Sequence, residues 1–368
     1  MKRMCVLCVA LFVLVMALPA LATETRVHTM GDQQLFIQDD FNIWTWSSTV
    51  NNYPRHLIVD HNDAYTLSNT VEFGNTRVGM IVPFMKNAVV GAFVSDGEFL
   101  DLAPVSIQQK IDLFYGYRAS NMDLGIHVDW WGNKDEDTTS EESGSVLGIQ
   151  AGVGFNANGN MFELDAFYRK IDFTDDPNNN AADAGTWVGA AGRYLWAYNN
   201  MVTIVPAIRV EQIKVSDTAS PVFEGKATVL DLGVGCNTVP LQGTEFLTSL
   251  GIMVSKGEGS VAGTTTIDTT VNTIPYLKFG ADIQVKPWLN FRIGAQKWIM
   301  QKEEDKLANT TSTNSDLTYD LGAGIMLGDV QFDARLSNSF LNNGPYLLSG
   351  AETFGGMFPS VSFKYDYR

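Results

Sequence analysis

One histidine lies between two carboxylates at a spacing that could do chemistry. His127 alternates with Asp123 and Asp129, so in an extended strand the three side chains share one face. An imidazole beside a carboxylate can act as a general base or bind a metal. On neighbouring positions of one strand face, the same trio more often forms a hydrated cluster on a water-facing wall, and we prefer that interpretation.

Two acidic segments, 133–142 (NKDEDTTSEE) and 172–183 (DFTDDPNNNAAD), offer hard oxygen ligands for calcium. They lack the ordered ligand spacing of an EF-hand, and solvated loops are the preferred interpretation. The sequence contains no G-x-S-x-G, H-E-x-x-H, phosphate-binding or dinucleotide-binding motif in the required context. We therefore predict no enzyme, no catalytic residue, no metal site and no cofactor.

Charged residues of both signs recur on one face of many segments. At membrane depth such charges must face water or one another, so we predict that they line the lumen of a pore. The predicted lumen set is Lys110, Asp112, Arg118, Asp123, His127, Asp129, Glu163, Asp165, Arg169, Arg193, Arg209, Glu211, Lys278, Asp282, Arg292, Asp333 and Arg335.

The elements that carry these residues have a hydrophobic period close to two. Apolar and polar residues alternate in 122–131 (MDLGIHVDWW), 275–285 (PYLKFGADIQV) and 330–336 (VQFDARL). A helix would need apolar residues three and four positions apart. Many of these predicted strands run to 9 residues or more, whereas a soluble strand averages about 5 to 6. Such lengths suit strands that cross a bilayer.

The predicted connections alternate between short turns and long polar loops, as in membrane barrels with short periplasmic turns and longer extracellular loops. Short turns are expected near 85–87, 120–121, 157–159, 198–200, 240–243, 286–287 and 328–329. Long loops are expected near 95–106, 132–144, 174–185, 216–225, 256–270, 301–315 and 338–356.

These turns define fourteen strands between residues 76 and 337, and 357–367 supplies a terminal strand. Residues 67–73 can supply a missing first strand. We predict an all-β fold: a transmembrane antiparallel up-and-down β-barrel of about 16 strands over residues 63–368, with 14 as the alternative count. Aromatic residues near strand ends should lie at the membrane surface. They are Trp130, Tyr168, Tyr194, Trp196, Tyr198, Trp288, Trp298, Tyr365 and Tyr367.

The N-terminus is typical of a cleaved signal peptide. Lys2 and Arg3 precede an apolar stretch, and Ala20-Leu21-Ala22 fits a cleavage site, so residues 1–22 are predicted to be removed. Only Cys236 then remains, so no internal disulfide can form. Residues 23–62 have irregular patterning and are expected to form a periplasmic arm, a plug in the lumen or a strand pair.

The mature chain is acidic. Removal of Lys2 and Arg3 leaves 23 basic against 41 acidic residues, a formal charge of −18. Nucleic acid is therefore excluded as a partner, because phosphate binding needs a basic face. The expected location is the outer membrane of a Gram-negative-type bacterium. The expected partners are outer-membrane lipid, lipopolysaccharide and the barrel-assembly machinery.

This combination of signal peptide, long alternating strands, turn and loop rhythm and aromatic strand ends resembles bacterial outer-membrane porins. The resemblance covers nearly the whole mature chain and implies a transmembrane pore, often a homo-oligomer. The last residues depart from the porin pattern, because Arg368 follows the alternating Phe363, Tyr365 and Tyr367.

The segment 41–50 (FNIWTWSSTV) also resembles the N-terminal region of the long-chain fatty-acid transporter family and its secretion-associated relatives. Asn42 matches the first asparagine of their N-x-x-x-N-P-A pattern, but Trp46-Ser47-Ser48 replaces the Asn-Pro-Ala. That resemblance implies fourteen strands, an N-terminal hatch and a hydrophobic ligand.

The main functional hypothesis from the sequence is a passive channel for small hydrophilic solutes. The alternative is a hatch-plugged transporter of hydrophobic ligands, or a structural or secretion-associated barrel. A soluble exported β-sandwich or an outer-membrane enzyme is the third hypothesis.

Overall fold

A computed structural model of the chain describes residues 24–62, 65–67, 71–73, 76–102, 105–136, 141–174, 183–217, 223–261, 263–336 and 359–367. The predicted signal peptide lies outside the described residues. Within these ranges, no helix is long and apolar enough to cross a membrane.

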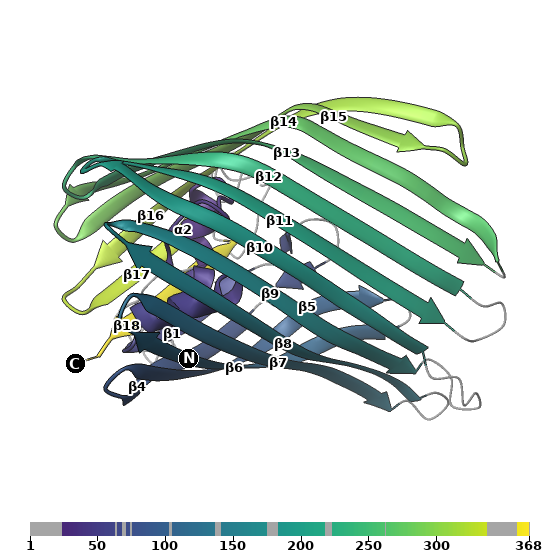
Figure 1. Ribbon diagram of the computed structural model, residues 1–368, viewed down its shortest axis with the longest axis horizontal. Coiled ribbons are helices and arrows are strands. Elements are labelled where there is room, and N and C mark those ends of the chain that lie inside the picture. The colour runs from purple at the N-terminus through teal and green to yellow at the C-terminus, as the bar shows by residue number, and fades with distance from the viewer. Residues whose placement is uncertain are drawn as a thin grey trace, which may run out of the picture.

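Sixteen of the described strands close into one antiparallel barrel (Figure 1). The barrel closes because β1 pairs with β18 on one side and with β4 on the other. The barrel strands are β1 (His56–Asn62), β4 (Thr76–Met85), β5 (Ala88–Leu102), β6 (Val105–Ala119), β7 (Met122–Glu136), β8 (Glu141–Ala157), β9 (Asn160–Thr174), β10 (Asp183–Asn199), β11 (Val202–Asp217), β12 (Phe223–Leu241), β13 (Thr244–Val261), β14 (Thr264–Lys286), β15 (Leu289–Asp305), β16 (Thr310–Met326), β17 (Val330–Leu336) and β18 (Ser360–Asp366). The predicted fold class and strand count are confirmed, and the alternative count of fourteen is wrong.

The first strand of the barrel differs from the prediction. The described part of 67–73 does not join the barrel. It belongs to β2 (Tyr65–Leu67) and β3 (Val71–Phe73), which pair with each other as a separate two-stranded sheet. The barrel begins instead at β1, which was predicted to belong to the irregular arm. This strand has only seven residues and is polar at both ends (HLIVDHN), so its alternation is short and hard to detect.

All seven predicted short turns join consecutive strands at one end of the barrel (Figure 1). At the other end, four predicted loops are largely strand. In the loop predicted at 95–106, β5 ends at Leu102 and β6 begins at Val105, and in the loop at 132–144, β7 ends at Glu136 and β8 begins at Glu141. In the loop at 256–270, β13 ends at Val261 and β14 begins at Thr264, and in the loop at 301–315, β15 ends at Asp305 and β16 begins at Thr310. In 301–315, polar residues on both faces remove the alternation, while the backbone hydrogen bonds of the ladder continue.

Successive side chains point alternately outward and inward. The outward face carries an apolar belt, with Leu113, Ile149 and Leu250 each more than half exposed. Such a continuous apolar surface is far larger than a soluble monomer exposes. Trp130, Tyr168 and Trp196 are exposed on this face as predicted. Trp298 is not, because it shares the inward face of Arg292 and packs against the interior core.

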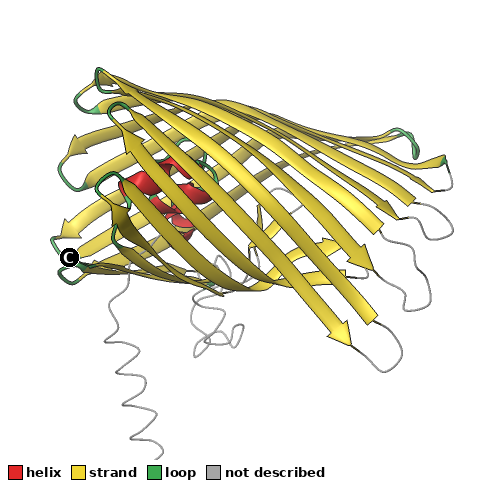
Figure 2. Cartoon of the chain, turned by 60° about the horizontal axis from the view of Figure 1, so that its bottom comes forward, coloured by secondary structure: helices red, strands yellow, loops and turns green. Residues whose placement is uncertain are grey.

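Three short helices lie inside the barrel near the turn end (Figure 2). They are the α-helix α2 (Glu24–Thr29) and the 3₁₀ helices η1 (Asp40–Trp44) and η2 (Ser47–Asn52). Their apolar side chains form the main core of the protein together with inward residues of the wall, such as Phe93, Phe114 and Leu247.

Candidate functional site

Residues 24–55, which we call the plug, occupy the lumen near the turn end of the barrel. Ile37, Ile43, Trp46 and Val50 have no exposed surface at all. Burial of one such side chain contributes about 1.5–3 kcal/mol. Of the three predicted arrangements for this irregular segment, a plug in the lumen is therefore the one observed.

Arg26 joins the plug to the wall through three carboxylates. Its guanidinium donates to Asp282 on β14 at 3.0 Å and to Glu245 on β13 at 2.5 Å, and it also pairs with Asp39 of the plug. Asp39 in turn accepts from the backbone N–H of Phe41 and so caps η1. One cation therefore connects α2, η1 and two strands. A planar guanidinium with several donors is suited to this role.

Arg193 on β10 holds the middle of the plug. Its Nη1 donates to the carbonyl oxygens of Ile37 at 2.7 Å and Leu35 at 3.3 Å. Its Nε pairs with Glu163 on β9 at 2.5 Å, and its guanidinium lies 4.5 Å from the ring centroid of Trp46. Arg193 thus joins β9, β10 and the plug through its Nε, its Nη1 and the face of its guanidinium.

The helix η2 contacts β7 and β9. Asp165 accepts two hydrogen bonds of 2.8 Å from Ser47, one from its backbone N–H and one from its hydroxyl. Asn51 donates to the carbonyl oxygen of Leu124 at 2.9 Å. These bonds satisfy polar groups that would otherwise be buried without partners, which is costly.

Strands on the opposite side of the barrel complete the attachment. Glu24 pairs with Arg77 on β4 at 3.3 Å, and Asp40 pairs with Lys364 on β18 at 2.9 Å. The hydroxyl of Thr25 lies 2.6 Å from that of Ser362. The plug is therefore bonded to strands on all sides of the lumen rather than to one wall.

Inward-facing glycines allow the plug backbone to approach the wall closely. A Cβ on Gly125 would lie 2.1 Å from the backbone carbon and oxygen of Ser47, and one on Gly294 would lie 2.3 Å from the backbone nitrogen of Gly31. Further wall glycines in contact with the plug are Gly116, Gly152, Gly233, Gly235, Gly280 and Gly322. Ordinary side chains at these positions would fill the space that the plug occupies.

We therefore expect Gly125→Ala to displace η2, because the new methyl group meets backbone that cannot rotate away. The cost should be about 1–3 kcal/mol, as for other overpacked sites. Hydrogen exchange measured by mass spectrometry should increase in residues 44–53. Gly257→Ala is the matched control, because no atom lies within 4 Å of a Cβ on that wall glycine. Unchanged exchange in Gly125→Ala would contradict the observed position of η2.

His28 gives the docked plug a pH dependence. It lies between Glu24, 3.5 Å from its Nε2, and Asp32, which contacts its Nδ1. Burial disfavours the charged imidazole, but the carboxylates of Asp32 and Glu24 outweigh it and raise the pKa of His28 from 6.5 to about 9.

The pKa of His28 is higher in the docked plug than in a released one, so protonation of His28 stabilises the docked state. This stabilisation is complete below pH 6.5 and is lost as the pH rises through about 9. The loss should be on the order of 3 kcal/mol. Proteolysis of the plug should therefore accelerate between pH 6.5 and pH 10. His28→Gln should flatten this profile, and an equally steep profile in that variant would rule out His28 as the titrating group.

His127 makes contacts other than those expected from its strand. Its Nε2 lies 2.7 Å from Asp112, its Nδ1 lies 3.2 Å from the amide oxygen of Gln150, and its ring stacks on Phe114. The expected same-face carboxylates, Asp123 and Asp129, pair instead with Arg118 and Arg169. Gln150 also donates to the carbonyl oxygen of Trp44. His127 therefore supports a residue that holds the plug.

Most of the predicted lumen set is buried inside the barrel. The buried members are Lys110, Asp112, Asp123, His127, Asp129, Glu163, Asp165, Arg169, Arg193, Asp282, Arg292 and Asp333. Arg209, Glu211, Lys278 and Arg335 are partly buried, and Arg118 is exposed. Several pair across an intervening strand, as in Arg292 of β15 with Asp333 of β17 at 2.7 Å and Arg169 of β9 with Asp129 of β7 at 3.0 Å. Their role in lining a solute path remains a prediction.

Nearer the loop end, β7–β11 carry an inward apolar cluster that periodicity alone did not predict. Trp131 and Trp187 pack edge to face with centroids 6.1 Å apart, and Phe167 packs on Trp187 in the same way. Val146 and Ile171 belong to the same cluster. Trp131 follows Gly125 and Asp129 along β7, so the cluster lies beyond the plug toward the loops. The lumen of a porin is usually polar.

Among the described residues, no group of three or more His, Cys, Asp or Glu side chains could hold a metal ion. The acidic segments 133–142 and 172–183 fall largely outside the residues whose side chains are described. Cys236 is a free thiol in the belt region of β12, consistent with a small packing residue.

No protein family and no curated protein matches the sequence at a significant level. Solved structures do match the fold. The ferric citrate transporter FecA in its unliganded form superposes with a TM-score of 0.50 at 8% identity, covering 77% of this chain and 51% of that chain. The chain thus spans about half the length of that transporter.

Two further structures have lower scores. CdiB from Acinetobacter baumannii has a TM-score of 0.44 at 11% identity, covering 84% of this chain and 59% of its own. The alcaligin outer membrane receptor FauA from Bordetella pertussis has a TM-score of 0.42 at 7% identity, covering 77% and 60%. At these identities the comparison with FecA shows the barrel fold alone.

The resemblance to outer-membrane barrels is thus supported at the level of fold. The fourteen strands implied by the fatty-acid transporter resemblance are wrong, whereas an N-terminal segment does lie in the lumen. Asn42, which carried that resemblance, donates from its side-chain amide to the carbonyl oxygen of Ile37 within the plug.

Proposed function

We propose that the chain is an outer-membrane barrel closed by its own N-terminal plug, and that it passes ligands only when the plug moves. The observation that carries this proposal is the attachment of residues 24–55 to strands on all sides of the lumen. While it stays docked, a plug bonded at so many points would close the aqueous path at the turn end. A hatch-plugged transporter is therefore favoured over a passive pore.

Two features support the membrane location. The outward apolar belt, with exposed residues such as Leu147 and Leu232, needs lipid around it. The strands from β5 to β16 have 15 to 23 residues each, more than enough to cross a bilayer when tilted. The fold shared with an outer-membrane transporter agrees with this location.

The inward cluster of Trp131, Trp187 and Phe167 supports a ligand with an apolar or aromatic body. Aromatic side chains contribute large contact areas and bind apolar groups through their ring faces and edges. They stand between the loop end and the plug, where a ligand would arrive before the plug moves. Arg169 lies 4.8 Å from the ring centroid of Trp187 but is already neutralised by Asp129. The site therefore favours no net charge on the ligand.

The test is single-channel recording of the intact protein in planar bilayers. The plugged barrel should insert without steady conductance at low voltage. A steady current from the intact chain would overturn the proposal and favour the second candidate, a passive channel for small hydrophilic solutes. The charged interior face is what favours that candidate. A purely structural or secretion-associated barrel would stay silent with or without its plug.

A further inference from the structure

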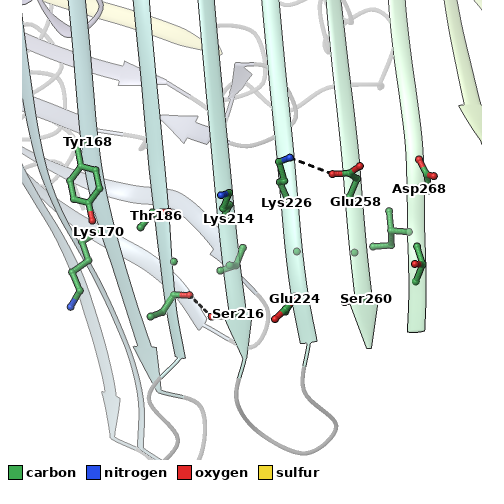
Figure 3. Close-up of a pocket in the computed structure, with 17 residues that line it drawn as sticks. Tyr168, Lys170, Thr186, Lys214, Ser216, Glu224, Lys226, Glu258, Ser260 and Asp268 are labelled. Atoms are coloured by element: carbon green, nitrogen blue, oxygen red, sulfur yellow. Dashed lines mark hydrogen bonds and ion pairs between the residues drawn. The ribbon is translucent and has the colours of Figure 1, made fainter. Parts of the chain in front are cut away.

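The outer face of the barrel carries a concave pocket of about 780 Å³ at the loop end of β9–β14 (Figure 3). Its polar side chains belong to the outward face. In β9, Lys170 is an even number of residues from the exposed Leu164 and Tyr168, so it shares their outward face. In β12, Lys226 shares the outward face of the exposed Leu230 in the same way. The pocket therefore opens away from the lumen and does not belong to the plug.

Three lysines lie in one row across this pocket. The strand register places Thr186 opposite both Lys170 and Lys214, and it places Lys214 directly opposite Lys226. Like charges directly opposite each other on neighbouring strands destabilise a sheet. In a chain with a formal charge of −16, such a row is a local exception. An anion bound between the lysines would offset the repulsion.

Ion pairs neutralise this row at its two ends, and Glu224, two positions from Lys226 on the same face, also lines the pocket nearer the loops. Lys170 lies 2.8 Å from Asp172, and Lys226 lies 3.5 Å from Glu258. Glu258 is also paired with Lys256. Among the described side chains, Lys214 in the centre has no ion-pair partner. The pocket therefore holds Glu224, Glu258 and Asp268 beside its three lysines, and Lys214 at the centre is the lysine with which none of the described carboxylates pairs.

The lysines stand at the edge of the apolar belt. Outward residues of β9 run from Leu164 through Tyr168 to Lys170, and those of β11 run from Val210 through Gln212 to Lys214. A lysine at this level can lay its methylene stem against acyl chains while its ammonium reaches the headgroups. Tyr168, half exposed beside Lys170, is also suited to that level.

We propose that this outer lysine pocket, formed around Lys170, Lys214 and Lys226, binds the phosphate of an anionic membrane lipid. The acyl chains then lie along the belt below it. This inference rests on the proposed membrane location but not on the transport function. Lysine is a common ligand of phosphate groups, and each lysine near a membrane surface adds to the attraction of anionic lipid.

The test is native mass spectrometry of the full chain in detergent, titrated with phosphatidic acid or with phosphatidylcholine. The intact protein should retain phosphatidic acid preferentially. The double variant Lys214→Gln/Lys226→Gln should weaken that retention about tenfold to thirtyfold, as expected from roughly 1 kcal/mol per lysine. Lys302→Gln is the matched control, because this outward lysine of β15 pairs with Glu304 outside the pocket.

Equal retention by the double variant and the control would overturn the proposal. Displacement of the lipid by inorganic phosphate at equal concentration would also overturn it, since the site would then bind free phosphate rather than lipid. Insertion of the same proteins into phosphatidylcholine vesicles, scored by protease protection, separates failure of the membrane location from failure of the lipid site.

Discussion

Removal of the plug should turn a silent barrel into a conducting one. Deletion of residues 24–53, with the leader and β1 retained, should produce steady single-channel currents about tenfold or more above those of the intact protein, because a sixteen-strand barrel leaves an aqueous lumen. The barrel should survive the deletion. Wall pairs such as Arg193–Glu163 and Arg292–Asp333 do not depend on the plug.

The control for this deletion is the folded state of the barrel itself, measured by the mobility difference between heated and unheated samples in electrophoresis. Equal conductance of the intact and truncated chains, with both barrels folded, would remove the plug from the mechanism. Silence of a folded truncated barrel would instead favour the structural or secretion-associated alternative.

Arg26→Met should release the plug without removing it. Methionine keeps the volume but leaves Asp39, Glu245 and Asp282 without this cation. Breaking a buried ion pair by removing one partner typically costs about 3–5 kcal/mol. Asp282 retains Arg292 at 2.9 Å, so the loss falls mainly on the contact between plug and wall. We expect intermittent conductance and faster exchange of residues 24–45, while the barrel remains folded.

Arg55→Met provides the matched control, because Arg55 is an exposed arginine at the junction between the plug and β1. Arg26→Lys should be intermediate, since one ammonium cannot reach three carboxylates on separate elements. If Arg26→Met behaved like Arg55→Met in both conductance and exchange, the carboxylate cluster would not be what holds the plug.

Alternation along the chain was sufficient to predict the barrel. Where one face meets an apolar belt and the other meets polar groups, as in 122–131, the period of two appears directly in the residue types. The short turns could be located because they interrupt that period. The same logic failed at 256–270 and 301–315, where polar residues predominate on both strand faces and ion pairs such as Lys306–Asp268 accompany the backbone pairing.

The candidate site was predicted in part. The inward position of Asp165, Arg193 and Asp282 follows from alternation, but their partners do not. Each binds a plug residue more than a hundred positions earlier in the chain. The inward glycines were the available signal: Gly125 and Gly294 lie on faces that otherwise carry large charged side chains. Small residues at such positions indicate that something else fills the space.

The sequence by itself determined the antiparallel barrel and the acidic charge, because these follow from local periodicity and composition, whereas the count of sixteen was right although its first strand was misplaced. Only the tertiary structure decided that residues 24–55 fill the lumen, that the barrel begins at His56, and that three lysines from separate strands share one row. Strand register and plug contacts depend on pairings between distant residues, and no local pattern of residue types encodes those pairings.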